Sequence, residues 1–155
     1  MSHSLKRLQK EFNDLIKIDP ENITAKMLED NYIWELTLKG PKDTPYEGGT
    51  FYFEVKFPYD YPFKPFKLIL TTKIYHPQFV KMGDYTSQIC CCVTRTGMDS
   101  WSPAMTLPKI LKENILPYFS YPDFNNNCMD REYFGKKFDD DFIKIAKEWT
   151  LKYAM

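Results

Sequence analysis

The chain has 155 residues, enough for one domain with one sizeable hydrophobic core, and we expect a single domain over residues 1–155. Its 21 basic and 21 acidic residues balance, so the charge gives no indication of nucleic acid as the main partner. No apolar run approaches the roughly 18 residues that suggest a membrane span, and the N-terminus lacks the pattern of a signal peptide. We therefore expect no membrane association.

The first predicted element is a helix over residues 4–17, ended by Asp19-Pro20. Its apolar residues recur at helical spacing and form one face: Leu5, Leu8, Phe12, Leu15 and Ile16. Four strand candidates follow, at 23–28 (the weakest signal), 33–39, 50–57 and 67–72. In the second and third of them apolar residues alternate with polar ones, which is typical of an antiparallel sheet with one buried face.

The segments between these strands carry turn and loop residues. Residues 40–49 contain Gly and Pro dipeptides and predict a turn, whereas the prolines of 58–66 exclude a central strand and predict an ordered loop. Thr106 can cap a helix that runs through Ile115, and we expect Pro117 to end it because proline removes a hydrogen bond and clashes with the preceding turn. A last helix begins at 139–141, where three aspartates suit the positive end of a helix dipole. This order predicts an α+β fold.

The four cysteines are Cys90, Cys91, Cys92 and Cys128. Adjacent cysteines can close only a strained ring, and no C-x-x-C spacing is present, so neither a disulfide framework nor a zinc site is predicted. This usage indicates a reducing compartment and a cytoplasmic or nuclear location. A redox role for the three adjacent thiols is an alternative that predicts a reversible vicinal disulfide.

The segment from Lys73 to Thr106 carries the most specific pattern of the chain. A His76-Pro77 turn and a Trp-Ser-Pro turn beginning at Trp101 flank Cys90, which directly follows Ile89. A cysteine thiolate is a strong nucleophile that can hold an acyl group as a thioester. A free cysteine is more often a small buried hydrophobe, but the two flanking turns favour the nucleophile.

This arrangement resembles the signature of ubiquitin-conjugating enzymes: His-Pro-Asn, then Ile-Cys, then Trp-Ser-Pro. The resemblance runs from Leu5-Lys6-Arg7 to the closing residues 148–155 and is closest to the compact D-type enzymes. It implies an N-terminal helix, a four-stranded antiparallel meander, an active-site loop region and C-terminal helices. It also implies that Cys90 accepts ubiquitin from an activating enzyme as a thioester. A RING- or U-box-type ligase then assists its transfer to a substrate lysine, and no cofactor or metal is needed.

The resemblance also implies roles for individual residues. Cys90 keeps the register of the nucleophile, while His76, Pro77 and Trp101 shape the turns of the active site. Gln78 stands where the family has an asparagine that steadies the loop and the oxyanion; glutamine keeps the amide but changes its reach. Small insertions, relative to compact members of the family, flank the cysteine on both sides, between Gln78 and Cys90 and between Cys92 and Trp101.

Two positions that usually carry carboxylates near the incoming lysine become Cys92 and Asn125. Asp123, in the same loop, can substitute for the second, although 121–127 can equally be a simple polar turn. These departures leave open a non-catalytic relative that binds ubiquitin or ligases, which the retained Cys90 disfavours.

The resemblance further implies a shared surface for ligases and the activating enzyme. Its expected residues lie on the first helix and two loops: Lys6, Arg7, Phe63, Ser102, Pro103 and Ala104. Prolines on both sides of Phe63 favour presentation of its ring to a partner. Thr24 is expected to mark a second, weak ubiquitin contact. A conjugating enzyme for another ubiquitin-like modifier is a further alternative, which the pattern at Phe63 and residues 102–104 disfavours.

Overall fold

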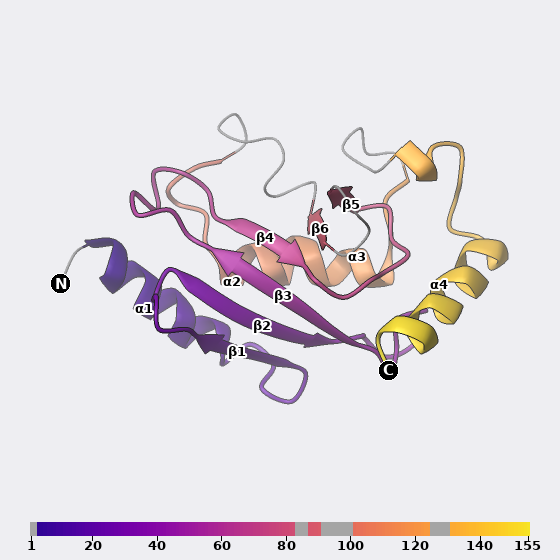
Figure 1. Cartoon of the computed structure of the whole chain (residues 1–155), viewed down its shortest axis with the longest axis horizontal. Coiled ribbons are helices and arrows are strands. Elements are labelled where there is room, and N and C mark those ends of the chain that lie inside the picture. The colour runs from indigo at the N-terminus through magenta and orange to yellow at the C-terminus, as the bar shows by residue number, and fades with distance from the viewer. Residues whose placement is uncertain (1–2, 83–86, 91–100, 125–130) are drawn as a thin grey trace.

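The computed structural model describes residues 3–82, 87–90, 101–124 and 131–155. An N-terminal helix is followed by an antiparallel sheet and then by helices, which confirms the predicted α+β fold (Figure 1). The first elements are α1 (His3–Leu15), β1 (Ile23–Met27), β2 (Ile33–Lys39), β3 (Thr50–Lys56) and β4 (Lys67–Leu70). The predicted four-stranded meander is present, with bounds within two residues of those expected from the sequence.

The alternation in β2 and β3 decides which face of the sheet is buried. Apolar side chains at every second position of both strands are buried, and their neighbours are more exposed. Antiparallel pairing places Leu36 opposite Phe53, so the two apolar rows coincide. The later helices cover this face: the rings of Phe51 and Phe119 have centroids 5.5 Å apart. In Figure 1 these helices lie behind the sheet, with α1 toward one end and the last helix at the other.

The sheet contains two short strands that the sequence did not predict. They are β5 (Phe79–Met82) and β6 (Ser87–Cys90), and the strand order is β1-β2-β3-β4-β6-β5. Both lie inside the segment that carries the signature. Strand β6 pairs with β4 on one side and with β5 on the other, all antiparallel. The signature cysteine therefore belongs to the sheet.

Helix α1 ends at Leu15, two residues earlier than predicted. The next residues form a tighter turn, in which Lys17 N–H donates to Asp14 O at 3.3 Å and Ile18 N–H donates to Leu15 O at 3.2 Å. Ile16, expected on the buried face, is 38% exposed, whereas Glu11 in the middle of the helix is buried.

The second helical run contradicts one prediction, because it continues past Pro117 to Ser120. It consists of α2 (Leu107–Ile110), the π-helical turn η3 (Leu111–Ile115) and α3 (Leu116–Ser120). Thr106 caps its start as predicted, accepting from Lys109 N–H at 3.3 Å. In the π-turn Leu116 N–H donates to Leu111 O five residues back, so the hydrogen-bond register shifts just before the proline. Pro117 then occupies the first turn of α3, where a missing N–H is tolerated.

The chain ends in the short helix η4 (Arg131–Tyr133) and the helix α4 (Asp140–Tyr153). Asp139 caps α4, because its Oδ1 accepts from Phe142 N–H at 2.9 Å, and this start agrees with the predicted aspartate cluster. Among the helices of the described residues, none combines the length and the apolar character that crossing a membrane requires.

Candidate active site

Strands β5 and β6 bring the two ends of the signature together. In their antiparallel register Cys90 lies opposite Phe79, the residue directly after Gln78. The residues between Gln78 and Cys90, which include the predicted insertion, largely form the two arms of this strand pair. The sheet thus places the backbone of Cys90 beside the His76-Pro77-Gln78 turn.

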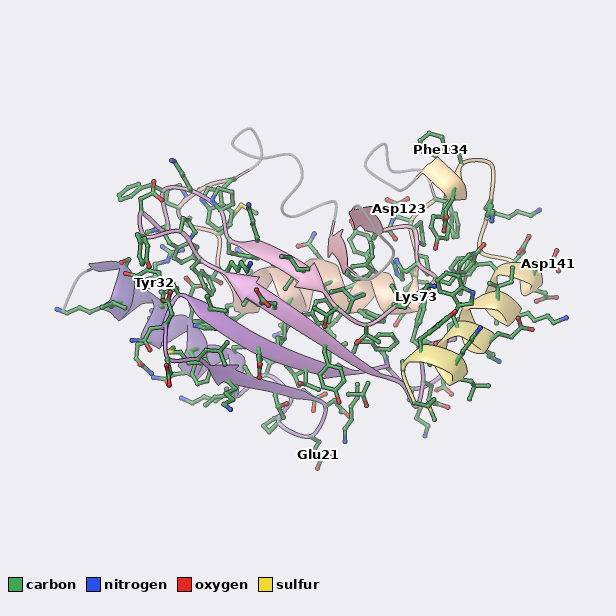
Figure 2. The ribbon with its side chains drawn as sticks, viewed as in Figure 1. Glu21, Tyr32, Lys73, Asp123, Phe134 and Asp141 are labelled. Carbon is green, nitrogen blue, oxygen red and sulfur yellow. The ribbon has the colours of Figure 1, made fainter. Side chains whose placement is uncertain are left out.

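The side-chain amide of Gln78 is buried and pairs with the backbone of Asp123. Its Nε2 donates to Asp123 O at 2.5 Å, and its Oε1 accepts from Asp123 N–H at 3.0 Å. A side-chain amide that makes both bonds to one residue acts as a short piece of β-ladder. Asp123 is thereby fixed next to the β5–β6 pair, where Figure 2 shows its side chain. The glutamine side chain thus links the turn 76–78 to the loop that carries Asp123.

His76 is fully buried, and both ring nitrogens are engaged. Nδ1 accepts from Gln78 N–H at 3.0 Å, and Nε2 lies 2.7 Å from Tyr118 O. Because Nδ1 accepts, the proton sits on Nε2 and is donated to that carbonyl. Burial lowers the pKa of His76 to about 4, against the opposing effect of the Tyr118 hydrogen bond. A neutral imidazole with both nitrogens engaged links this turn to its own backbone and to the carbonyl of Tyr118.

Two buried phenols support the same turn, and sequence reasoning missed both. The Tyr133 oxygen accepts from His76 N–H at 3.0 Å, and Tyr46 O–H donates to Tyr75 O at 2.6 Å. Burial raises the pKa of both Tyr46 and Tyr133 above the ordinary value for tyrosine, so both remain protonated. The only signal in the sequence was the abundance of aromatic residues, which does not indicate particular partners.

Trp101 connects the second turn of the signature to the loop 58–66. Its Nε1–H donates to Pro62 O at 2.7 Å, and its ring centroid lies 5.7 Å from that of Phe66. Within the loop, Phe63 N–H donates to Asp60 O at 2.9 Å, so the predicted ordered loop is present. The two loops predicted for the partner surface are therefore fixed to each other.

The predicted partner residues differ in exposure. Phe63 is 70% exposed, which agrees with the presentation expected from its flanking prolines. Most of the others are exposed as well: Lys6, Ser102, Pro103 and Ala104, together with Thr24 on β1. Arg7 is half-buried and makes internal contacts. Whether any of these residues binds a partner stays a prediction.

The described residues thus bring together His76, Gln78, Asp123 and the backbone of Cys90. Cys92 and Asn125, where the family usually carries carboxylates, lie outside the described residues, as do Cys91 and the second insertion. Within the described part of the chain, no three His, Cys, Asp or Glu side chains gather as metal ligands would.

Comparison with known proteins agrees with this fold. Residues 7–150 match the family model of the ubiquitin-conjugating enzymes. A crystal structure of a Plasmodium yoelii protein assigned to these enzymes is 35% identical, with a TM-score of 0.81, over 100% of this chain and 97% of that chain. The E2 domain of a Toxoplasma gondii ubiquitin-conjugating enzyme is 28% identical, with a TM-score of 0.78, over 99% of this chain and 100% of that domain. The chain belongs to the ubiquitin-conjugating enzyme family.

Proposed function

We propose that the protein accepts ubiquitin from an activating enzyme as a thioester on Cys90 and transfers it to a substrate lysine with a RING- or U-box-type ligase. The observation that carries the proposal is the register of β5 and β6. It places Cys90 beside a His76-Pro77-Gln78 turn whose polar side chains are buried and hydrogen-bonded. That turn is the part of the signature that belongs beside the nucleophile in this family.

The proposed reaction does not need a strong base at the cysteine. The Cys90 thiolate attacks the thioester carbonyl of ubiquitin on the activating enzyme, whose own thiolate leaves. In the second step a lysine amine attacks the new thioester, the Cys90 thiolate leaves, and the amine loses a proton. His76 is buried and neutral with both nitrogens engaged, so it does not serve as the base.

Asp123 is the described carboxylate best placed to help the amine. The Gln78 pair fixes its backbone next to the strands that end in Cys90. A nearby carboxylate orients a lysine ammonium and can accept its proton. In this family a carboxylate usually stands at the position of Asn125. We assign its role to Asp123, and we assign Gln78 the role of positioning Asp123.

The partner surface of the proposal comprises Lys6, Arg7, Phe63 and the exposed turn 102–104. An exposed aromatic ring held on an ordered loop is well suited as an interface anchor. The pattern of Phe63 with Ser102-Pro103-Ala104 favours ligases that use D-type enzymes, and it favours ubiquitin over a related modifier.

The test of the chemistry is a charging assay with ubiquitin, an activating enzyme and ATP. We expect the wild-type protein to form an adduct that a thiol reagent removes. Cys90→Ser should yield an oxyester that survives the reagent, because serine oxygen is a poorer leaving group. Cys91→Ser and Cys92→Ser are the matched controls and should still form the thioester.

Two outcomes would overturn the proposal. A thioester that persists in Cys90→Ser but disappears in Cys91→Ser or Cys92→Ser would show that the nucleophile is misassigned. A wild-type protein that forms no adduct, yet binds ubiquitin or a ligase domain, would instead establish the non-catalytic alternative.

A further inference from the structure

The carboxylate of Glu11 is buried in the middle of α1, on the face where a helix of this kind carries apolar residues. It is only 3% exposed and accepts hydrogen bonds from three different segments of the chain. Arg7 Nε donates to it at 2.9 Å from the same helix, and Leu107 N–H donates at 2.8 Å from the start of α2. Tyr61 O–H contacts both carboxylate oxygens, at 2.9 and 2.7 Å, from the loop 58–66.

Arg7 extends this cluster to the second partner loop. Its terminal nitrogen donates to Met105 O at 2.6 Å, and its guanidinium carbon lies 5.4 Å from the centroid of the Tyr61 ring. Its side chain is only 26% exposed. Burial and the Glu11 charge raise the pKa of Tyr61, which keeps its hydroxyl a donor.

The three segments joined by this cluster are the ones that carry the proposed partner surface. Helix α1 carries Lys6, the loop 58–66 carries Phe63, and the segment that ends at Met105 carries the exposed turn 102–104. A buried ion pair costs desolvation and contributes little stability over an apolar packing of the same volume. Its planar, hydrogen-bonded geometry does fix the relative position of the groups it joins.

We propose that Glu11, Arg7 and Tyr61 are positioning residues of the partner surface, which set the placement of the Phe63 loop relative to the turn 102–104. The inference rests on the proposed function and refines it, because it assigns Arg7 an action within the protein. A ligase then contacts Lys6, Phe63 and the turn 102–104 directly. Arg7 contributes by holding these groups in one arrangement.

The first experiment uses Tyr61→Phe, which removes one hydroxyl and keeps the ring, and Glu11→Gln, which removes the charge and keeps the shape. A panel of isolated RING and U-box domains is screened for acceleration of lysine discharge from the charged wild-type protein, and the most active domain is the probe. We expect each variant to raise the half-saturating concentration of that domain at least tenfold. The maximal rate of discharge, and the maximal rate of charging at saturating activating enzyme, should stay within twofold of wild type. Gln9→Ala, an exposed change on the same helix, is the control and should alter none of these quantities.

The second experiment separates positioning from direct contact at Arg7. Lysine keeps the charge but cannot reproduce the guanidinium fork that joins Glu11 to Met105 O. We therefore expect Arg7→Lys to raise the half-saturating concentration of the domain nearly as much as Arg7→Ala does. In protein that already carries Glu11→Gln, Arg7→Lys should raise this concentration little further. A direct charge contact predicts that Arg7→Lys retains most of the wild-type affinity.

The outcomes distinguish this inference from the proposed function. Folded Tyr61→Phe protein with wild-type half-saturation overturns the inference, and because that change is small, it carries the test even if Glu11→Gln fails to fold. Full affinity in Arg7→Lys overturns the role of Arg7. A panel in which no domain accelerates discharge refutes the partner surface and this inference together, whereas a wild-type protein that cannot be charged refutes the enzyme itself.

Discussion

Gln78 shows how one side chain can be fully committed to structure beside a reactive centre. Its amide donates to and accepts from the backbone of Asp123, and it is buried. No part of this pair requires the Asp123 carboxylate. The structural contribution of the loop and its proposed chemical contribution can therefore be separated by substitution at two neighbouring residues.

We predict that Gln78→Asn destabilises the protein by about 1–3 kcal/mol, because the shorter side chain loses the paired hydrogen bonds between the buried amide and the half-buried backbone of Asp123. The measurement is the free energy of unfolding in urea. Asp123→Ala is the matched variant: it loses no hydrogen bond to Gln78 and should instead slow discharge of the thioester to free lysine. Equal stability of Gln78→Asn and wild type would show that the pair adds nothing to the fold.

His76 gives a pH-dependent prediction. Its pKa in the folded protein is about 4, below the value near 6.5 of an unfolded chain. Below pH 6.5 the unfolded state therefore binds a proton that the native state does not, so stability is full above that pH. The contribution of His76 is lost as the pH falls from about 6.5 to about 4, by about 3 kcal/mol in total.

The measurement is an NMR titration of the imidazole signals. The chain has two histidines, so a His3→Gln variant identifies which signals belong to His76. We expect the His76 signals to remain those of a neutral ring down to about pH 5. A midpoint near pH 6.5 in the folded protein would contradict the buried, doubly bonded geometry.

At the scale of elements, the sequence predicted the strands that have a periodic pattern of apolar residues. It missed the short strands that are defined by pairing with distant segments. Period-two alternation predicted β2 and β3, because each strand buries one face along its whole length. Strands β5 and β6 have four residues each, too short to show a period, and their pairing with each other and with β4 defines them. The signature motifs found the site, but the partners of Gln78 and His76 lie about 40 residues away and leave no local pattern.

The prediction that the helix ends at Pro117 was wrong for a local reason. The rule that proline ends a helix assumes an unbroken i→i−4 register, and the π-turn η3 shifts that register by one residue. Glu11 was missed for the opposite reason. From sequence alone a carboxylate within a helix is expected to be exposed to solvent. Only the structure shows that Tyr61 and Leu107 donate hydrogen bonds to it in the core.

The cap of α4 provides the test at this scale. Asp139→Ala removes the acceptor for Phe142 N–H and should cost about 1 kcal/mol of stability. Asp139→Asn is the control, since asparagine also caps well, and it should cost only a few tenths of a kcal/mol. Thermal unfolding of the two variants measures the difference. Equal losses in both would assign the effect to the helix dipole instead of the cap.

At the scale of the whole molecule, two separate systems of hydrogen bonds hold the candidate active site and the proposed partner surface. One holds the turn 76–78 against Asp123, Tyr118 and Tyr133, beside Cys90. The other joins α1, the loop 58–66 and the start of α2 around Glu11. In the part of the chain that the structure describes, these hydrogen bonds involve separate sets of residues. Substitutions on the exposed side of the second should therefore change recognition by a partner and leave the chemistry at the cysteine intact.

Phe63→Ala tests this division most directly. The ring is 70% exposed, so its truncation removes little core packing and should leave the unfolding temperature unchanged. Loss of an interface anchor commonly costs 2 kcal/mol or more, which is roughly thirtyfold in affinity for a ligase domain. We expect charging on Cys90 at saturating activating enzyme to proceed largely as in wild type, whereas ligase-stimulated discharge should need a correspondingly higher domain concentration. Tyr59→Ala, at an aromatic residue of the same loop that is 75% exposed, is the matched control for loss of an exposed ring. If both variants weaken the domain equally, the loop acts as a general apolar surface; if neither does, Phe63 is not the anchor, and the turn 102–104 must carry recognition.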